Sequence, residues 1–489
     1  MSVTHLDNLD KIVSLSKARG FIFQSSDIYG GLGAVYDYGP LGAELKRNIQ
    51  REWWKSMTQL HDNIVGLDAA IFMHPRTWEA SGHVEGFNDP MIDDKQSNKR
   101  YRADMLIEQH ILKLREKGKK DKADEIQHLL DTTGTRKGIC EDLYEIIMDE
   151  EIRAPESGAF DWTEVRQFNL MFKTHYGATS SGEDDAIYLR PETAQGIFVN
   201  YKNVMDTARV QVPFGIAQIG KAFRNEVVAR QFVFRMREFE QMEMQYFVEP
   251  GTDQDEYEKW LEARLNWHKK MGVRESNLRT SPHPPDKLAH YARAAADIQY
   301  KYPIGWQEVE GIHNRTDFDL SRHQEYSGKK MEYYDQQKQE RYIPYVIETS
   351  VGLDRTTLMI LCDAYREEEV DGDTRTVLKM NPKLAPTKIG IFPLIKKDKL
   401  QNLAKKIEAD LRDEFNVLYD ESGSIGKRYR RQDEAGTPFC VTVDFDGVES
   451  DGEDTVTIRY RDDMTQDRIP AAKVGDFVRD KMKNWSPED

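Results

Sequence analysis

The chain has 489 residues, which is typical of two or three domains, and 39% of its residues are hydrophobic against 31% charged, a balance that favours globular domains over disorder. The formal net charge of -16 argues against a protein that coats nucleic acid indiscriminately, although a local basic face could still bind a specific RNA. No segment approaches the ~20 apolar residues of a membrane-spanning helix, and the first residues lack the basic and apolar regions of a secretion signal.

The opening block, to about residue 99, contains the start of a long amphipathic helix. Pro40 suits the first helical turn, where its missing N–H costs nothing. Behind it, apolar residues recur every four positions, at Leu41, Leu45, Ile49, Trp53 and Met57. Periodicity alone leaves open whether this stripe packs into the core of the chain or against another subunit. Charged, helix-prone sequence then predicts an inserted helical module at about 105–155.

The middle of the chain contains runs with the period of β-strands. The run 212–228 is apolar and punctuated by glycine. The run 240–248 alternates, which places Met242, Met244, Tyr246 and Val248 on one face and Gln241, Glu243 and Gln245 on the other, as in an antiparallel strand. A second helical insertion is predicted at about 254–302, where prolines interrupt the pattern, and strand-like sequence returns at 311–319 and 345–350.

A domain boundary is predicted near residue 384, between Pro382 and Pro386, which divides the chain into domains 1–384 and 385–489. Beyond it, strand-like runs at 388–393, 439–445 and 455–460 surround a helix-like run at 399–415. This alternation predicts a small α/β domain. The basic run 427–431 could contact RNA phosphates or form a solvated charged turn.

Two arginine-centred segments carry the chemistry. In the first, Phe223-Arg224-Asn225-Glu226, the sequence predicts a strand on which the arginine and the glutamate share a face. The arginine could bind a phosphate bidentately, or the two residues could form an ordinary cross-strand ion pair. The run 229–239 that follows interleaves arginines with aromatic residues, which suits phosphates and a stacked base. Its phenylalanines, Phe232 and Phe234, could instead simply fill the core.

The second segment, 348–355, reads Glu-Thr-Ser-Val-Gly-Leu-Asp-Arg and leads into a helical pattern. Gly352 allows a close backbone approach to a ligand, and the helix N-terminus and Arg355 both favour anions. A capped core helix with a surface arginine would look the same in isolation. Glu192, in a polar cluster at 189–196, and Glu348 could jointly hold an ammonium group, although each alone is more often an ion-paired surface carboxylate.

In this order the two segments resemble motifs 2 and 3 of class II aminoacyl-tRNA synthetases. Over nearly the whole chain the sequence resembles glycyl-tRNA synthetases of the homodimeric type, most specifically at Arg166–His175. Pro40 and the following helix resemble motif 1, which forms the dimer interface in that family. Further matching stretches are Tyr101–Asp104, Arg190–Phe198, Gly311–Arg322, Ile425–Tyr429 and Thr437–Val441.

The resemblance implies an α+β class II core, an antiparallel sheet flanked by helices, with the helical insertions and a C-terminal α/β anticodon-binding domain. It implies ATP-dependent attachment of glycine to tRNA(Gly) through glycyl-adenylate, by a cytoplasmic homodimer that uses Mg²⁺. Some relatives carry a cysteine-rich knuckle ahead of Arg166, but residues 154–158 contain no cysteine. Cys140, Cys362 and Cys440 are also too scattered for a disulfide framework or a Cys-x-x-Cys site, so no zinc and a reducing compartment are expected.

The resemblance also implies roles for residues at matching motif positions. Arg224, Glu226 and Arg355 would be catalytic, with Arg224 at the α-phosphate of ATP and Glu226 at the adenine. Phe239 would stack on the adenine, Arg235 would lie near the γ-phosphate, and Arg355 would cover the other adenine face or the γ-phosphate. The implied ATP-binding set is Arg224, Asn225, Glu226, Phe234, Arg235, Met236, Arg237, Glu238, Phe239, Glu308, Val309, Gly352, Leu353, Asp354 and Arg355, with Glu308 as a magnesium ligand. The implied glycine-binding set is Arg102, Glu192, Phe239, Glu240, Gln241, Met242, Glu243, Glu348, Thr349, Ser350, Val351 and Gly352.

Two other functions fit part of the pattern. A synthetase of another specificity, such as prolyl, seryl or threonyl, is disfavoured by the stretches around Arg166 and Glu348. A synthetase-like nucleic-acid-binding protein without catalysis should have lost its arginines, whereas Arg224, Arg235 and Arg355 all remain. One departure from the family is Thr349. The family often has Glu-Pro-Ser where this chain has Glu348-Thr349-Ser350, and only a backbone adjustment is expected there.

Overall fold

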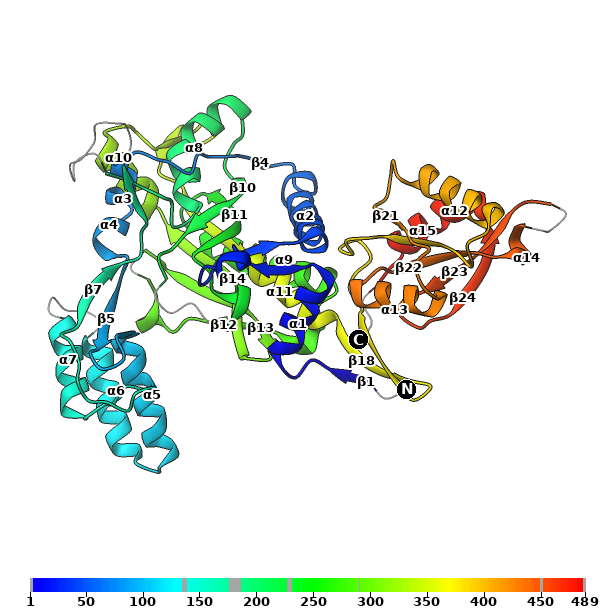
Figure 1. The fold of residues 1–489 in the computed structure, drawn as a ribbon. Coiled ribbons are helices and arrows are strands. Elements are labelled where there is room, and N and C mark those ends of the chain that lie inside the picture. Colours follow the sequence, from blue (N-terminus) through cyan, green and yellow to red (C-terminus); the bar gives the residue numbers. More distant parts are fainter. Residues whose placement is uncertain are drawn as a thin grey trace.

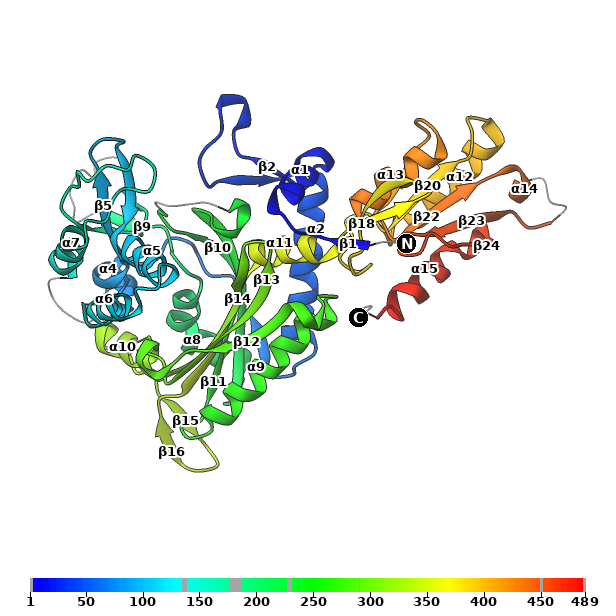
Figure 2. The same cartoon turned by 90° about the horizontal axis from the view of Figure 1, so that it is seen from below.

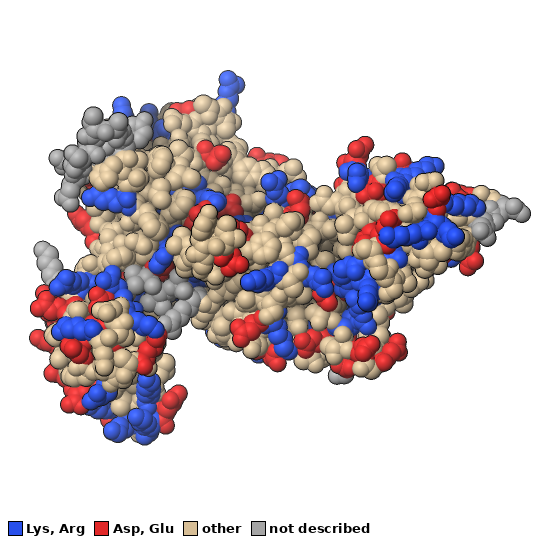
Figure 3. All heavy atoms as spheres, viewed as in Figure 1, with Lys and Arg blue, Asp and Glu red and all other residues tan. Residues whose placement is uncertain are grey.

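A computed structural model describes residues 3–133, 139–175, 186–226, 231–289, 291–448 and 452–486. In Figures 1 and 2 a central sheet lies between an insertion module at one end of the molecule and a C-terminal domain at the other. Positive and negative side chains are interspersed over the face drawn in Figure 3. Within the described ranges, no helix combines the length and the apolar character needed to cross a membrane.

The central sheet has seven strands in the order β12-β13-β14-β17-β11-β10-β4. Every neighbouring pair is antiparallel except β10 and β4, which run parallel. The predicted antiparallel sheet is therefore confirmed. The strands are β4 (Ile64–Gly66), β10 (Phe214–Phe223), β11 (Glu238–Val248), β12 (Leu278–Pro282), β13 (Ala294–Tyr302), β14 (Gly305–Thr316) and β17 (Tyr345–Gly352).

Helices cover both faces of this sheet. On one face, Met242, Met244 and Val248 of β11 lie in a large apolar core with α2, α9 and α11, which confirms the predicted alternation. On the other face, apolar residues near one end of β10 and β11 pack against α8, while Gln241, Glu243 and Gln245 form a polar region. The helices of this part are α1 (Leu9–Arg19), α2 (Pro40–Trp54), α3 (Pro75–Ala80), α4 (His83–Gly86), α8 (Ala194–Ala208), α9 (Asp253–Lys270), α10 (Phe318–Ser327) and α11 (Leu353–Ala364).

The stripe predicted on α2 is a core-packing stripe. Leu45, Ile49, Trp53 and Met57 are all fully buried within this one chain. Pro40 occupies the first helical position as expected. Burial of the stripe inside the chain accounts for its spacing, so the stripe itself does not indicate a second subunit.

Two local predictions were wrong. Residues 254–302 are α-helical only to Lys270, and β12 and β13 then form the outer strands of the central sheet. Buried residues such as Ile298, Tyr300 and Tyr302 alternate along β13, a period of two that an alanine-rich, charged context obscured. The strand predicted for Arg224 and Glu226 ends at Phe223, and the Glu226 N–H donates to the Arg224 carbonyl at 2.7 Å, so these residues lie in a tight turn.

The insertion module contains the helices predicted at 105–155. Helices α5 (Ala103–Glu116), α6 (Lys120–Thr133) and α7 (Ile139–Asp149) pack together around their own apolar cluster. A three-stranded sheet of β5 (Asn88–Asp94), β6 (Lys99–Arg102) and β7 (Arg166–Asn169) joins them to the core. The remaining two-stranded pairs are β2 (Ile22–Gln24) with β3 (Tyr36–Tyr38), β8 (Lys173–His175) with β9 (Ala186–Tyr188), and β15 (Tyr333–Asp335) with β16 (Glu340–Tyr342).

The C-terminal domain follows a small connecting sheet. We call β1 (Val3–His5), β18 (Tyr365–Val370) and β19 (Asp373–Leu378) the connector sheet, because these strands pair in that order between the two parts of the chain. Beyond it a five-stranded mixed sheet has the order β21-β20-β22-β23-β24, as expected for a small α/β domain. Its elements are β20 (Ile389–Pro393), α12 (Asp398–Leu411), β21 (Val417–Tyr419), α13 (Ile425–Ala435), β22 (Phe439–Val443), α14 (Phe445–Val448), β23 (Thr455–Tyr460), β24 (Gln466–Pro470) and α15 (Val474–Lys483).

Candidate active site

A cavity of about 300 Å³ opens where β11 and β17 meet the start of α11. The two arginine-centred segments of the sequence converge here because β11 and β17 are neighbours, with Gln241 opposite Gly352 and Glu243 opposite Ser350. The lining residues are Arg224, Glu226, Val233, Phe234, Arg235, Met236, Phe239, Glu240, Gln241, Glu308, Val309, Ser350, Gly352, Asp354 and Arg355.

Arg224 is held between two aromatic rings at the end of β10. Its guanidinium carbon lies 5.3 Å from the ring centroids of both Phe87 and Phe239. Its Nε donates to the Pro191 carbonyl at 3.0 Å, and its backbone N–H donates to the Arg237 carbonyl at 2.9 Å. The guanidinium is therefore oriented before any ligand arrives, as anion binding requires.

Arg355 lies across the cavity, in the first turn of α11. Its guanidinium carbon is 4.4 Å from the Phe234 ring centroid, and its Nη1 donates to the backbone carbonyl and to Oε2 of Glu308, both at 3.1 Å. Burial opposes ionisation of Glu308, but Arg355 outweighs it and lowers the pKa of this carboxyl below its ordinary value. Glu308 is therefore an anion at the rim of the cavity.

The start of α11 is tied to α2 by Asp354. One carboxylate oxygen accepts from the Tyr38 hydroxyl at 2.6 Å and from Lys46 Nζ at 3.1 Å, and the other accepts from the Glu240 N–H at 2.7 Å. Lys46 also pairs with the Glu240 carboxylate at 2.5 Å. These contacts fix the floor of the cavity relative to the long helix α2.

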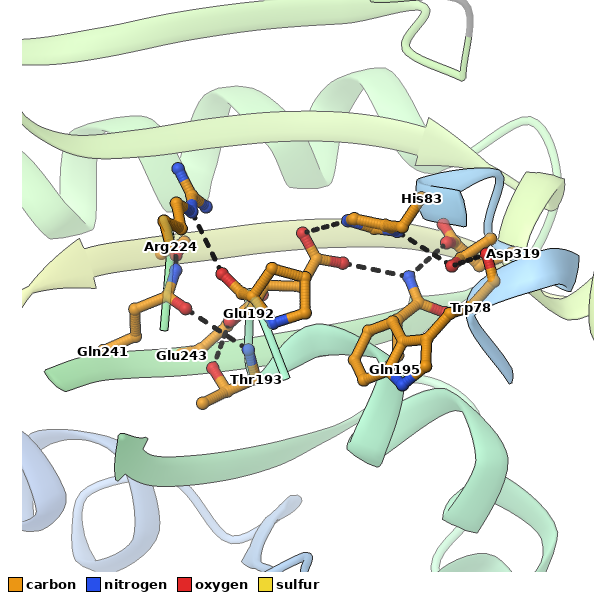
Figure 4. A network of polar contacts seen from close by, with 12 residues as sticks. Trp78, His83, Glu192, Thr193, Gln195, Arg224, Gln241, Glu243 and Asp319 are labelled. Carbon is orange, nitrogen blue, oxygen red and sulfur yellow. Dashed lines mark hydrogen bonds and ion pairs between the residues drawn. The ribbon is translucent and has the colours of Figure 1, made fainter. Parts of the chain in front are cut away.

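A cluster of buried carboxylates lies next to this cavity (Figure 4). Glu192 Oε2 lies 3.3 Å from His83 Nε2, and Glu192 Oε1 accepts from Gln195 Nε2 at 3.0 Å. Burial opposes ionisation of Glu192, but His83 and then Arg315 outweigh it and lower its pKa to about 2. Because Ser81 Oγ lies 2.8 Å from His83 Nδ1, the imidazole is held at both nitrogens.

Two further carboxylates of this cluster accept from the same side-chain amide. Gln245 Nε2 donates to Glu243 Oε1 at 2.8 Å and to Glu348 Oε2 at 2.7 Å, and the Thr193 hydroxyl donates to Glu243 Oε2. Burial and repulsion from Glu348 and Glu192 raise the pKa of Glu243 well above its ordinary value. Burial opposes ionisation of Glu348 as well, but its cationic neighbours lower its pKa. A proton shared by the pair is therefore favoured on Glu243, and negative charge is favoured on Glu348.

Arg315 supplies the buried positive charge. Its Nη1 donates to Glu348 Oε2 at 3.2 Å, its Nε donates to Asp319 at 2.7 Å, and its guanidinium lies over the Tyr291 ring. Asp319 also accepts from Gln195 Nε2 at 3.1 Å, which closes a network back to Glu192. The network holds its carboxylates in fixed orientations without a ligand.

Gln241 links the two sites. It lines the cavity together with Ser350, and the Gln241 amide donates to Ser350 Oγ at 3.2 Å while its oxygen accepts from the Thr193 N–H at 3.3 Å. An arginine-rimmed cavity with aromatic walls suits a nucleoside triphosphate. The adjacent carboxylates suit a small ammonium group. A compound that carries an ammonium and a carboxylate could therefore lie beside a phosphate of the nucleotide.

A single carboxylate at the cavity rim suits Mg²⁺ that is held mainly by nucleotide phosphates, the usual arrangement for this ion. Glu308 meets that description, because it lines the cavity and its lowered pKa keeps it ionised. Over the described part of the chain, there is no group of three or more potential ligands that could hold a metal ion without the nucleotide.

The remaining sequence-predicted residues do not line the cavity. Met242, Val351 and Leu353 are fully buried on the core side, and Thr349 is also inaccessible. Asn225 and Arg237 hold the turn by backbone and side-chain hydrogen bonds, and Glu238 pairs with Lys221 at the surface. Arg102 lies on β6, where it pairs with Asp89 and Asp104, and the hydrogen bond to Asp104 is the main reason that its pKa is raised.

Several residues of the site were missed from the sequence. Gln195 and Arg315 lie in the stretches 190–198 and 311–322 that carry the family resemblance, so that signal could have found them. Lys46 lies on a helix that was read only for its apolar stripe. His83 is the first residue of the short helix α4 and belongs to no motif, so no sequence signal pointed to it.

The chain matches three known protein families. Residues 172–364 match the tRNA synthetase class II core domain (G, H, P, S and T), and residues 388–481 match an anticodon binding domain. Residues 89–137 and 117–170 match glycyl-tRNA synthetase insertion domain 1. The class II core, the inserted module and the C-terminal domain expected from the resemblance are thereby confirmed.

Three similar proteins that align over nearly their whole length are glycine-tRNA ligases. The chain is 56% identical to a glycine-tRNA ligase of Chlorobaculum tepidum, with 97% of this chain and 100% of the relative covered. It is 52% identical to a glycine-tRNA ligase of Treponema denticola, with 98% of each chain covered. It is also 52% identical to one of Geobacillus kaustophilus, with 97% of this chain and 99% of the relative covered.

Among solved structures, the fold resembles prolyl-tRNA synthetase of Cryptosporidium parvum complexed with L-proline and AMP. The TM-score is 0.60 at 13% identity, over 97% of this chain and 75% of that chain. The same enzyme with halofuginone and AMPPNP gives a TM-score of 0.61 at 14% identity, over 97% and 77%. At this level of identity the likeness concerns the fold alone.

Proposed function

The chain belongs to the glycine-tRNA ligase family of class II aminoacyl-tRNA synthetases, and on this premise we propose how its residues perform the reaction. The enzyme attaches glycine to tRNA(Gly) at the cost of ATP. The chemistry divides into activation of glycine as glycyl-adenylate and transfer of the glycyl group to the tRNA. The observation that carries this proposal is that Gln241 lines the arginine-rimmed cavity and also accepts from Thr193, whose hydroxyl donates to Glu243 of the carboxylate cluster.

In the proposed complex, ATP occupies the cavity. Arg224 binds the α-phosphate, Arg235 lies near the γ-phosphate, and Phe239 stacks on the adenine with Glu226 at its edge. Arg355 covers the opposite face of the base or contacts the γ-phosphate. This assignment is supported by the pre-oriented guanidinium of Arg224 and by the position of Arg355 over the Phe234 ring.

Glycine binds at the adjacent carboxylate cluster, with its ammonium group among Glu192, Glu243 and Glu348 and near Ser350. The support is electrostatic, because Glu192 and Glu348 have lowered pKa values and so present negative charge to an ammonium group. Discrimination against other amino acids can be steric, since any side chain would clash in a pocket built for glycine and no smaller amino acid competes. This agrees with the absence of any segment expected to be an editing domain.

Activation proceeds by attack of the glycine carboxylate on the α-phosphorus, which forms the mixed anhydride and releases pyrophosphate. The terminal ribose hydroxyl of the tRNA then attacks the acyl carbon and releases AMP. Neither step needs a covalent enzyme nucleophile, so positioning and stabilisation of charge by Arg224 and Arg355 dominate. Mg²⁺ held by Glu308 and the phosphates would neutralise charge on the departing pyrophosphate.

The wider organisation extends this proposal. We assign tRNA anticodon binding to the domain 385–489 and catalysis to 1–384, in a cytoplasmic homodimer. The match of residues 388–481 to an anticodon binding domain supports the first assignment. We place Arg102 at the glycine site because it lies in the stretch 101–104 that resembles the family.

Amino-acid-dependent exchange of pyrophosphate into ATP, run with all twenty amino acids and Mg²⁺, tests the proposal. We expect exchange with glycine alone. Exchange with a different amino acid would refute the glycine site while leaving the nucleotide site intact. Folded protein that neither supports exchange nor binds ATP would refute both assignments and favour the non-catalytic alternative.

A further inference from the structure

A buried ion cluster joins the connector sheet to the C-terminal domain. The strands β18 and β19 lie between the region that matches the class II core, which ends at residue 364, and the region that matches the anticodon binding domain, which begins at 388. The connector sheet is therefore the place where the two functional parts meet. Helix α13 of the C-terminal domain packs directly on β19.

Asp433 of α13 is the centre of the cluster. Its side chain is inaccessible, with an exposed fraction of 1%. One carboxylate oxygen accepts from Arg375 Nε of β19 at 2.8 Å and from Arg459 Nη2 of β23 at 3.2 Å, and the other accepts from Arg459 Nη1 at 2.9 Å. A single carboxylate is thus shared by one arginine from each side of the junction.

Arg375 uses its other nitrogens on both sides of the same junction. Its Nη1 donates to Glu368 Oε2 of β18 at 2.6 Å, and its Nη2 donates to the backbone carbonyl of Arg461 in the C-terminal domain. In return Arg461 Nη2 donates to the Met380 carbonyl at 2.8 Å. The side chains of Arg375 and Arg461 are 0% and 1% exposed, so these bonds form without competing water.

Two outer contacts tie the N-terminal segment to the same junction. Arg19 of α1 pairs with Glu434 of α13, next to Asp433 in sequence. Lys11 of α1 pairs with Glu367 of β18 at 3.1 Å, and β1 pairs with β18 along its length. The N-terminal segment, the connector sheet and α13 therefore form one continuous contact.

Buried ion pairs of this kind add less to stability than well-packed apolar residues would, but they are directional. A rotation of the C-terminal domain would leave Asp433 or Arg375 buried without its partner, which is strongly unfavourable. At an apolar interface of the same area, a small rotation of the domain would cost less free energy, because no buried charge would lose its partner. The cluster therefore favours one orientation of the domain, and none of its residues lines the cavity.

We infer that Asp433 and Arg375 are positioning residues for the tRNA step, holding the C-terminal domain at the angle at which a tRNA bound there reaches the active site with its acceptor end. This inference rests on the proposed function, since it needs a tRNA that contacts both parts of the chain. It assigns the cluster no part in glycine activation, which occurs wholly within the other domain.

The test compares Asp433→Asn with the wild-type enzyme in three assays. We expect glycine-dependent pyrophosphate exchange within about twofold of wild type. We expect kcat/KM for charging of full-length tRNA(Gly) to fall by roughly tenfold or more, mainly through KM. Charging of a minihelix that carries only the acceptor stem should change little, because this substrate does not contact the C-terminal domain.

The control is Glu414→Gln, which removes an exposed ion pair with Arg479 at 2.8 Å inside the same domain. This variant should behave as wild type in all three assays. Equal losses for exchange, minihelix and full-length tRNA in Asp433→Asn would mean a general structural defect and would overturn the inference. Unchanged charging of full-length tRNA would overturn it as well.

If Asp433→Asn does not fold, Glu434→Gln gives a second test at the edge of the same junction. It breaks the contact with Arg19 at a site where both side chains are partly accessible. The same selective loss is expected with a smaller magnitude, and the absence of any selective loss refutes the inference. A wild-type enzyme without glycine-dependent exchange would refute the proposed function instead, so the two failures are distinct.

Discussion

Replacing His83 by glutamine tests whether this imidazole keeps Glu192 ready for an ammonium group. The two side chains lie 3.3 Å apart and are only 14% and 18% exposed. Burial is the largest influence on the Glu192 carboxyl and opposes its ionisation, whereas His83 is the main opposing influence. Without the imidazole the pKa of Glu192 should rise, so that a larger fraction of this carboxyl is protonated as pH falls.

The size of the effect follows from the geometry. Charges at this separation attract by about 5 kcal/mol at an effective dielectric constant near 20, and desolvation of the pair cancels much of that. Gln195 still holds the other carboxylate oxygen in the variant. We therefore expect glycine binding to weaken by roughly 1–2 kcal/mol, which is a rise of about 5- to 30-fold in the KM for glycine.

Pyrophosphate exchange with glycine varied at saturating ATP, and then with ATP varied, measures this effect. The KM for ATP should stay within about twofold. The rise in the KM for glycine should be larger at pH 6 than at pH 8, because protonation of Glu192 increases as pH falls. The control is His110→Gln, which breaks a 3.8 Å contact with Glu150 in the insertion module. A glycine KM that stays at the wild-type value at pH 6, or equal rises for glycine and ATP, would refute the reasoning.

Three further predictions follow from the same site. Arg224→Ala should lower glycine-dependent exchange by about 10²- to 10³-fold or more without changing the circular dichroism spectrum, and wild-type exchange would contradict its assignment to the α-phosphate. Glycine binding should release up to about one proton from Glu243, because an ammonium group stabilises its ionised form. Calorimetry in buffers of different ionisation enthalpy measures this release, and heats that do not depend on the buffer would contradict it. Glu192, with a pKa of about 2 against an ordinary 4.5, should contribute ~3 kcal/mol of stability that is present above pH 4.5 and lost as pH falls towards 2. Urea unfolding between pH 5 and 2.5 should therefore be less pH-dependent for Glu192→Gln, and identical slopes would argue against the depressed pKa.

The sequence predicted those parts of the fold whose signals are local. The alternation along β11 and the stripe on α2 identified both elements, because each buries one regular face. The strands β12 and β13 were missed, since alanine and charged residues in that stretch mask an alternation that only a neighbouring strand makes meaningful. The turn at Arg224 was missed for a similar reason, because the Asn225 N–H donates to the Leu170 carbonyl, a partner far away in the chain.

The residues of the candidate site that belong to motifs, such as Arg224 and Arg355, could be predicted from the sequence. The geometry of the site depends on register, and no local pattern could reveal that Gln241 lies opposite Gly352 or that His313 lies opposite Glu348. The role of Gln245 could not be predicted either, because a glutamine on the polar face of a strand is common. Only the structure shows that its amide donates to both Glu243 and Glu348. His83 could be identified as part of the site only from its 3.3 Å distance to Glu192 in the structure.

The pairing of the first strand with the connector sheet has a consequence for how this protein is made. Val3 pairs with Glu368, 365 residues later in the chain. At roughly 5–20 residues per second, a ribosome needs about 20–70 s to deliver that partner. During this time the N-terminal strand β1 lacks its partner β18. The surface on which α13 packs, formed by β19 and by Arg19 of α1, is also incomplete. The two functional parts of the enzyme can therefore lock together only late in translation, after most of the catalytic part has left the exit tunnel.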